Sequence, residues 1–172
     1  MRKVAIFIDH ENLVKTSEEI LKEKYNIEAL LEEARKEGQM IMGKAYVPFL
    51  PDSPAKNSYL YNFYKNGIEP VYSPSYSQSK NSQMKSLGDP MLICDVMQSL
   101  YEHPAIDVFF ICSGDKDIIP LLRKIAQKGK DVVVIGVASR SAQALIEECE
   151  HLKFKFIDYE KIHRPIRKSR KD

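Results

Sequence analysis

The distribution of apolar residues along the chain first indicates a set of buried strands. Three runs, Val4 to Ile8, Val108 to Cys112 and Val132 to Val137, consist almost entirely of β-branched, aromatic and other apolar residues. Strands without polar alternation are covered on both faces, as in a parallel sheet between two layers of helices. Weaker or shorter patterns predict three more strands, at Met40 to Val47, Ile68 to Tyr72 and Phe154 to Ile157.

Segments between the strands carry the spacing of amphipathic helices. Residues Ile27 to Lys36 have apolar side chains at positions 27, 30, 31 and 34, which lie on one helix face, and Gly38 ends the pattern. Four further helices are predicted at residues 53–66, 90–101, 118–127 and 141–150. Strand and helix therefore alternate along nearly the whole chain, which predicts right-handed βαβ units and a three-layer α/β fold with a parallel central sheet flanked by helices.

Residues Ser73 to Met84 interrupt this alternation. The segment is polar, lacks periodicity and contains one proline and five serines. It is interpreted either as a mobile surface loop or, because loops of this length are uncommon in compact domains, as a flap that faces a substrate.

Composition and charge are those of one globular domain with a basic end. The 172 residues are 44% hydrophobic and 29% charged, which suffices for one core. Residues 161–172 hold six Lys or Arg against one Asp, so the total charge of +2 leaves −3 for residues 1–160. We expect a domain at 1–160 and a basic tail at 161–172, which is either a solvated end or an arm for a polyanion.

The apolar runs predict neither a membrane span nor a signal peptide, and the cysteines show no pairing pattern. No run of about 18 apolar residues predicts a membrane span, and the apolar stretch after Met1-Arg2-Lys3 is broken at Asp9, too early for a signal peptide. The protein is therefore expected to be cytoplasmic, without a membrane partner. Cys94, Cys112 and Cys149 lack metal-ligand spacing and are expected to be buried free thiols.

Carboxylates follow two of the buried strands. Asp9 ends the first strand, and Asp115 and Asp117 follow the strand at Val108 to Cys112 through Ser113-Gly114. Ligands of open parallel sheets bind outside the carboxyl ends of the strands. If these two strands are neighbours, Asp9 and Asp115 project from the same edge of the sheet, within reach of one ion.

A third acidic position, Asp89, stands directly before a proline at the start of a predicted helix. That arrangement is typical of an N-cap, and Asp115 or Asp117 equally fits a cap of the helix that follows them. Asp9 has no evident helix to cap. Asp95 lies within a helix, where it is solvent-facing or salt-bridged, and it is not included among the ligands.

A cluster of carboxylates requires a cation, because two unit charges about 4 Å apart repel by roughly 4 kcal/mol at an effective dielectric of 20. Oxygen ligands without paired Cys or His favour a hard ion, Mg²⁺ or Mn²⁺, which keeps several waters and meets phosphate oxygens. Such an ion assists the attack of water on a phosphodiester. His10, beside the strand end, is interpreted as incidental rather than as a proton carrier.

Several motifs at these strand ends occur together: Val4 to Asp9 with Asn12-Leu13, Lys85 to Asp89 followed by Asp95, and Ser113 to Asp117 with Pro120-Leu121 and Gly129-Lys130. In this combination they resemble the NYN domain, in its LabA-like branch, within the PIN-like nuclease superfamily. The resemblance covers roughly residues 3 to 160, because Ser141 to Ile157 also resembles the closing helix and strand of the family. The chain departs from the family at His10-Glu11, where a small residue is common, and at Ile118, where an aromatic residue is common.

The resemblance implies a PIN-like, Rossmann-like sheet in which the first and fourth strands are neighbours. It also implies an RNA-cleaving activity that depends on Mg²⁺ or Mn²⁺. The implied metal ligands are Asp9, Asp89, Asp115 and Asp117, with Asn12 alongside.

The leading hypothesis is a metal-dependent ribonuclease whose partner is RNA, expected to be single-stranded. Asp9, Asp115 and Asp117 form the catalytic set, in which Asp117 binds the ion through water or orients the attacking water. Asn12 fixes a carboxylate or a phosphate oxygen, and Lys85 contacts the RNA backbone together with the basic tail. A homodimer is compatible with the sequence.

Two alternatives belong to other functional classes. One is a non-catalytic module that uses the same acidic edge and tail to hold RNA or a partner protein. The other is a phosphatase or phospho-acceptor domain, which also places an Asp at the end of its first strand. It fits poorly, because Glu11 stands where haloacid-dehalogenase-like phosphatases carry the second Asp of a D-x-D motif.

Overall fold

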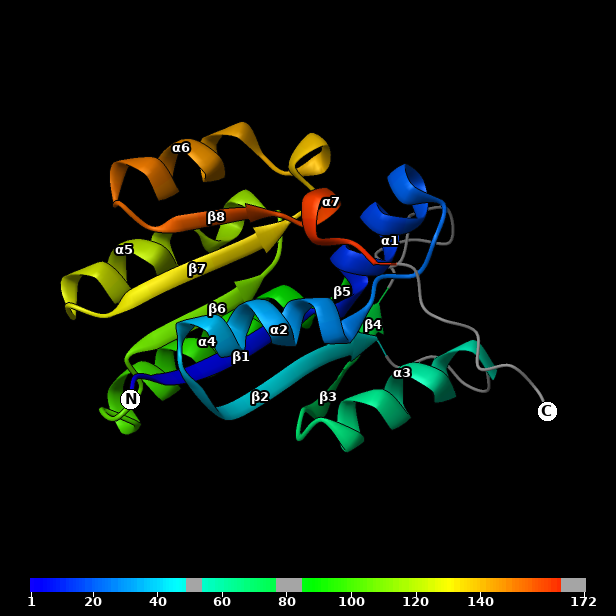
Figure 1. The fold of residues 1–172 in the computed structure, drawn as a ribbon, viewed down its shortest axis with the longest axis horizontal. Helices are drawn as coiled ribbons and strands as arrows, with labels where there is room; N and C mark the ends of the chain where they lie inside the picture. Colours follow the sequence, from blue (N-terminus) through cyan, green and yellow to red (C-terminus); the bar gives the residue numbers. More distant parts are fainter. Residues whose placement is uncertain (49–53, 77–84, 165–172) are drawn as a thin grey trace.

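A six-stranded parallel sheet forms the centre of the protein (Figure 1). In this computed structural model, residues 1–48, 54–76 and 85–164 are described. The strands are β1 (Lys3–Asp9), β2 (Gln39–Pro48), β3 (Glu69–Ser73), β6 (Val108–Cys112), β7 (Asp131–Gly136) and β8 (Lys155–Asp158). Their order is β3-β2-β1-β6-β7-β8, and every neighbouring pair is parallel. The parallel sheet is confirmed, with the first and fourth strands as neighbours.

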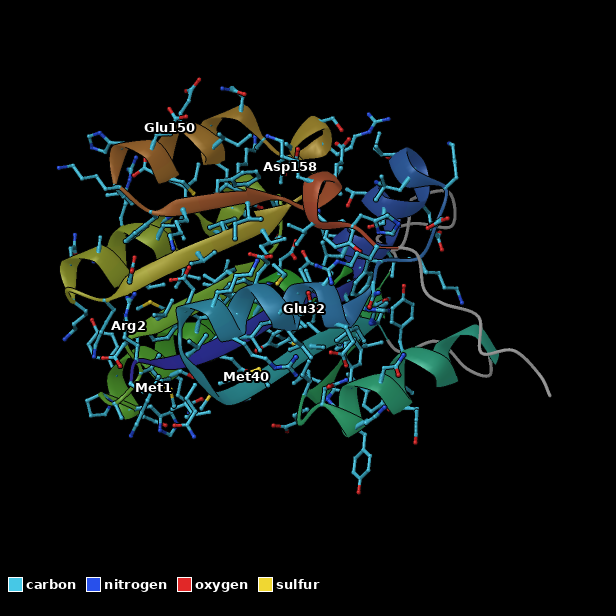
Figure 2. All side chains as sticks on the ribbon, viewed as in Figure 1. Met1, Arg2, Glu32, Met40, Glu150 and Asp158 are labelled. Atoms are coloured by element: carbon cyan, nitrogen blue, oxygen red, sulfur yellow. The ribbon has the colours of Figure 1, made fainter. Side chains whose placement is uncertain are left out.

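Helices cover both faces of this sheet, as the three-layer prediction requires. One face is packed by α1 (His10–Leu21), α2 (Ile27–Glu37), α3 (Pro54–Lys65) and the short α7 (Tyr159–Ile162), and the other by α4 (Gly88–Glu102), α5 (Ile119–Gln127) and α6 (Gln143–His151). Strand β1 supplies both cores, because Ile6 and Ile8 belong to the first and Ala5 and Phe7 to the second. Figure 2 shows side chains filling the space between the layers. No helix within the described ranges has the length and apolar character needed to cross a membrane.

Helix α1 has no counterpart among the predicted helices, whereas the other five long helices lie within a few residues of their predicted ranges. The inner face of α1 carries Leu13, Thr16 and Ser17, which are all buried. Two polar residues on that face hide the apolar periodicity by which a helix is recognised. The Thr16 hydroxyl is satisfied inside the helix, because it donates to the carbonyl oxygen of Asn12 at 2.8 Å.

The polar segment after β3 forms part of a small antiparallel ribbon. Strand β4 (Ser75–Tyr76) pairs with β5 (Lys85–Ser86), and residues 77–84 lie outside the described part of the chain. The surface-loop interpretation of 73–84 is therefore wrong at Ser73, which ends β3, and at Ser75 and Tyr76, which form β4. The ribbon returns the chain to α4, where the Gly88 amide donates to the Ser86 hydroxyl at 3.0 Å.

The sheet reverses its direction of growth between β1 and β6. From β1 the chain proceeds through β2 to β3 on one side, and from β6 through β7 to β8 on the other. Residues Val4 to Ile8 of β1 pair in register with Val108 to Cys112 of β6. Open α/β sheets bind ligands at the carboxyl ends of the strands beside such a reversal. Asp9 and Ser113 lie at that point.

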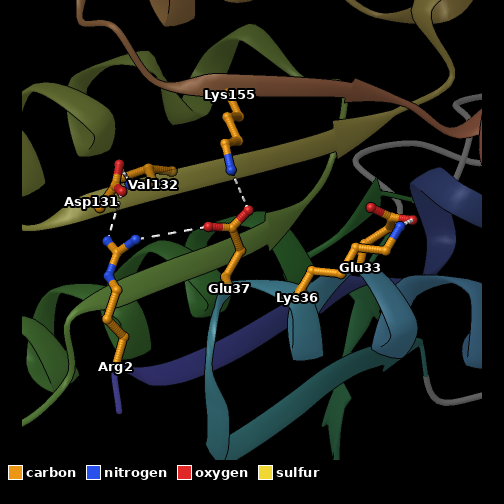
Figure 3. Close-up of polar contacts among 7 residues, drawn as sticks. All are labelled: Arg2, Glu33, Lys36, Glu37, Asp131, Val132 and Lys155. Carbon is orange, nitrogen blue, oxygen red and sulfur yellow. Dashed lines mark hydrogen bonds and ion pairs between the residues drawn. The ribbon is translucent and has the colours of Figure 1, made fainter.

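At the amino-terminal edge of the sheet, an ion-pair network joins segments that are far apart in the sequence (Figure 3). Arg2 lies 2.7 Å from a carboxylate oxygen of Asp131 in β7 and 3.8 Å from one of Glu37 at the end of α2. Glu37 also pairs with Lys155 of β8. Ion pairs near solvent contribute about 0–1 kcal/mol each, so most of the stability comes from the two apolar cores.

All three cysteines are free thiols, but only Cys112 and Cys149 are buried. Cys94 on α4 is exposed, so the expectation of a buried thiol is wrong at this position. Burial raises the pKa of Cys149 to about 11 and raises that of Cys112 further. The two buried thiols therefore stay protonated at neutral pH and are poor nucleophiles.

The Ser17 hydroxyl is buried without a hydrogen-bond partner in the described part of the protein. Alanine at this position removes a polar group that has lost its water, so Ser17→Ala is expected to raise the free energy of unfolding by about 1 kcal/mol. Urea denaturation followed by circular dichroism measures the change. Thr16→Ala is the matched comparison, because that hydroxyl is bonded, and it should lower stability by about 1 kcal/mol. A Ser17→Ala variant less stable than the parent would contradict the assignment.

Candidate metal centre

Asp9 is both the last residue of β1 and the N-cap of α1. Its Oδ1 accepts a hydrogen bond from the Asn12 backbone amide at 3.0 Å, and its Oδ2 accepts one from the Ser113 hydroxyl at 3.1 Å. The prediction that Asp9 has no helix to cap is therefore wrong. Capping does not exclude a second role, because a carboxylate offers about four lone-pair sites and these two bonds use only two of them.

Asp89 lies in the first turn of α4 and is not its N-cap. Leu87 occupies the cap position and makes no side-chain cap bond, and the Gly88 amide is satisfied by the Ser86 hydroxyl. The N-cap interpretation of Asp89 is therefore wrong. Its carboxyl group instead lies against that of Asp9 and forms a hydrogen bond with it.

The pair of Asp9 and Asp89 is electrostatically unfavourable when both carboxyl groups are ionised. Burial raises the pKa of Asp9 well above its ordinary range, and the charge of Asp89 and the hydrogen bond between the two groups raise it further. The hydrogen bonds from Asn12 and Ser113 act in the opposite direction. Two carboxyl groups in such contact either share a proton or hold a cation.

Asp115 is joined to this pair through Ser113. The Ser113 hydroxyl donates to Asp9 and accepts from the Asp115 backbone amide at 3.2 Å. Asp115 Oδ1 in turn accepts from the Asp117 amide at 3.0 Å, which caps the 3₁₀ helix η1 (Lys116–Ile118) that leads into α5. Of these two aspartates, Asp115 is the N-cap of η1. Asp117 is an exposed residue in the first turn of η1.

Asn12 connects α1 to the loop after β6. Its side-chain oxygen accepts a hydrogen bond from the Gly114 amide at 3.2 Å. The sequence analysis predicts that the Asn12 side chain contacts a carboxylate or a phosphate. In the structure, its oxygen instead binds the backbone of the loop that carries Asp115. Together, Asn12 and Ser113 link the ends of β1 and β6 by side-chain bonds in addition to the strand pairing.

Gly114 is required by close packing and not by a left-handed backbone. Its φ lies outside the positive region, which among glycines is occupied at Gly38, Gly67 and Gly129. A Cβ at position 114 would lie 2.6 Å from the hydroxyl oxygen of Ser141. The loop after β6 is therefore seated directly against the segment that follows β7.

The four predicted ligands do not form a single cluster. Within the described residues, no three His, Cys, Asp or Glu side chains come close enough together to hold one ion. The structure brings Asp9 and Asp89 into contact and places Asp115 one residue beyond Ser113. Whether Asp115 and Asp117 bind the ion stays a prediction.

The expected RNA contacts are only partly within the described structure. Lys85 lies in β5, but its side chain is outside the described part, and so are residues 165–172 of the predicted basic tail. Helix α7 spans residues 159–162 and therefore crosses the predicted boundary at residue 160.

His10 and Asp95 have structural partners. His10 is buried, its Nδ1 lies 2.6 Å from the Tyr25 hydroxyl, and its ring packs edge-on against aromatic rings. Asp95 accepts from the Tyr46 hydroxyl at 2.8 Å and pairs with Lys44 at 3.1 Å, which ties α4 to β2. The salt-bridge interpretation of Asp95 is confirmed.

Ser113 is the site residue that sequence reasoning did not identify. It is buried, it donates to Asp9 across the two strand ends, and it accepts a bond from the Asp115 amide in its own loop. The available signal is a single hydroxyl side chain between the apolar end of a strand and a glycine. A buried hydroxyl group at the end of a strand needs hydrogen-bond partners, and the carboxylates at the neighbouring strand ends are the candidates.

The donor set fits a hard divalent cation. Asp9 and Asp89 supply two carboxyl groups in one partly desolvated place, which is the number that Mg²⁺ commonly takes from a protein while it keeps several waters. Cysteine and histidine are not part of this pair, which favours oxygen-preferring ions.

The packing at Gly114 gives a stability test. Gly114→Ala should lower the free energy of unfolding by about 1–3 kcal/mol, because its methyl group would overlap Ser141. The double variant Gly114→Ala/Ser141→Gly removes that overlap and should recover part of the loss. Denaturation of all four proteins gives the coupling energy. Additive changes in the free energy of unfolding would contradict a steric contact between positions 114 and 141.

The raised pKa of Asp9 predicts a pH-dependent stability. A carboxyl group whose pKa is raised by folding stabilises the protein when protonated, and this contribution is lost as the pH rises through the folded pKa. Without metal, Asp9→Asn should therefore raise the free energy of unfolding at pH 7 by about 1 kcal/mol or more, and the gain should shrink as the pH falls. Urea denaturation in EDTA at several pH values measures this. The exposed Asp117→Asn is the control, and an equal response of both variants would contradict the prediction.

Comparisons with known proteins agree with this architecture. A solved structure of a protein of unknown function from Vibrio parahaemolyticus is similar, with a TM-score of 0.80 and 24% identity over 94% of this chain and 95% of that chain. No curated protein matches the chain significantly. The family model of the NYN domain matches residues 3–160, and the LabA-like branch stays a prediction. Because the match spans nearly the whole chain, the protein belongs to the NYN domain family.

Proposed function

We propose that this protein is a metal-dependent ribonuclease that hydrolyses phosphodiester bonds of RNA. The family lies within the PIN-like nuclease superfamily, which suggests nuclease activity. The observation that carries the proposal is the contact between Asp9 and Asp89 at the reversal point of the sheet. Two carboxyl groups in contact, one of them buried, cost stability when both are ionised, and cation binding is the function that accounts for this cost.

In this proposal, Asp9 and Asp89 hold Mg²⁺ or Mn²⁺, with Asp115 as a third ligand and Asp117 acting through water. When bound, the ion supplies Lewis-acid activation of water and neutralises charge on the phosphate. The Asn12 amide and the Ser113 hydroxyl donate to Asp9, which favours its ionised form and fixes its orientation. Asp117, which is exposed on η1, orients the attacking water or accepts its proton.

RNA is held mainly through its phosphates. We assign these contacts to Lys85 and to basic residues of the segment 161–172. Contacts of this kind position a nucleic acid without reading its bases, so cleavage should show little sequence preference.

A non-catalytic RNA-binding module is the second candidate. It is favoured by one observation, namely that the described residues contain no group of three acids able to hold an ion. The two functions are separated by cleavage in Mn²⁺ and by binding in EDTA.

Removal of the proposed ligands tests the enzyme directly. Asp9→Asn and Asp115→Asn should each lower the Mn²⁺-dependent cleavage of a single-stranded RNA by at least about 100-fold. Asp131→Asn is the matched control, because this aspartate pairs with Arg2 at the opposite edge of the sheet. Mn²⁺ should also raise the melting temperature of the parent protein more than that of Asp9→Asn.

Full activity of Asp9→Asn would contradict the proposed site. Binding of RNA in EDTA by a protein that cleaves no nucleic acid in Mg²⁺ or Mn²⁺ would favour the binding module instead.

A further inference from the structure

Helix α3 has an aromatic outer face. Its sequence ends in Tyr-Leu-Tyr-Asn-Phe-Tyr-Lys, and Tyr59 and Phe63 are buried against the sheet. Tyr61 and Tyr64, on the outer side, are 67% and 83% exposed. A surface helix normally presents polar residues there. Two large aromatic rings on one exposed helix face indicate a surface that contacts a partner.

The same face is cationic. Tyr61, Tyr64 and the exposed Lys65 follow the i, i+3, i+4 spacing that places side chains next to one another. The helix contains two lysines and no acidic residue, although residues 1–160 together carry a net charge of −3.

The nearest acid on β3 is directed away from this face. Glu69 pairs in parallel register with Lys44 of β2. Lys44 contacts Asp95 of α4, which packs on the face of the sheet opposite to α3. The aromatic face of α3 is therefore not neutralised by Glu69.

Helix α3 leads away from the candidate metal centre along one margin of the sheet (Figure 1). Strand β2 ends at Pro48, and its Tyr46 is in register with Asp9. Helix α3 starts at Pro54 and runs back along the sheet, so Tyr61 and Tyr64 lie about 10 and 15 Å along it at about 1.5 Å per residue.

We propose that the outer face of α3 binds single-stranded RNA, with bases stacked on Tyr61 and Tyr64 and a phosphate held by Lys65. The choice of RNA rests on the proposed function. Stacking on aromatic rings beside positive charge is how proteins hold single strands without sequence preference. The surface would then add affinity for longer RNA to the phosphate contacts at the metal centre.

A second copy of the chain is a less suitable occupant. Pairing of α3 with α3 would bring two helices without acidic residues and with like charge together. Strand β3, at the edge of the sheet, contains Pro70, which lacks a backbone donor and disfavours extension of the sheet by another copy.

Binding in EDTA, where no metal-dependent cleavage occurs, tests the proposal. Fluorescence anisotropy with oligouridylates of about 4 and about 16 nucleotides gives the Kd of the parent protein and its variants. Tyr61→Ala and Tyr64→Ala should each raise the Kd for the longer RNA roughly 5- to 100-fold and leave the shorter RNA unaffected. Tyr61→Phe and Tyr64→Phe keep the ring and should bind as the parent does.

Tyr101→Ala is the matched control. Tyr101 is 57% exposed and contacts Lys128, but it lies at the end of α4, away from α3. Loss of affinity in this variant equal to that of Tyr64→Ala would indicate a general effect of tyrosine removal and would overturn the proposal. So would unchanged binding by the two α3 alanine variants.

Two further results separate this proposal from the ribonuclease assignment. If the α3 variants bind long RNA normally while the parent cleaves RNA in Mn²⁺, the aromatic surface is refuted and the enzyme assignment stands. If the α3 variants lose affinity for long RNA while neither they nor the parent protein cleave RNA, the proposed RNA-binding surface is supported and the ribonuclease assignment fails. A dimer of the parent in sedimentation equilibrium that Tyr64→Ala dissociates would show a protein interface and would overturn the RNA proposal.

Discussion

Two carboxyl groups, Asp9 and Asp89, face each other at a point where water is largely excluded from Asp9. Their contact opposes folding whenever both are ionised, so the surrounding structure has to hold them in place. The Asn12 amide and the Ser113 hydroxyl offset part of the unfavourable burial by donating to Asp9. Side chains that are already held by hydrogen bonds need little further ordering when they bind a ligand, which is consistent with the proposed cation site.

The strand topology explains how these groups meet. Strands β1 and β6 are neighbours in the sheet, and their carboxyl ends carry Asp9 and Ser113. The loop after β6 is then fixed from two sides, by Asn12 of α1 and by Ser141 after β7. A Cβ at either Gly114 or Gly136 would lie 2.6 Å from the Ser141 hydroxyl oxygen. The absence of side chains at both glycines lets three segments approach closely enough to position Asp115.

Much of this arrangement follows from the sequence. The buried strands are evident because their residues are apolar throughout, and the acids at their ends follow from the rule for parallel sheets. Helix α1 is not evident, since Thr16 and Ser17 occupy its buried face. The distinction between a capping and a facing carboxylate is also invisible in sequence, because Asp89 before a proline has the same pattern in either case. The role of Ser113 depends on its contact with Asp9, a residue distant in the sequence, and a local sequence pattern cannot predict such a contact.

The bond between Ser113 and Asp9 joins residues that are 104 positions apart in the chain. During synthesis, β1 therefore emerges long before β6, which is one of its two neighbours in the sheet. At roughly 5 to 20 residues per second, the interval is on the order of 5 to 20 s. Until Ser113 has emerged after β6, Asp9 lacks its hydroxyl donor. The bond that orients Asp9 from the β6 side can therefore form only after residues 1–113 have been synthesised.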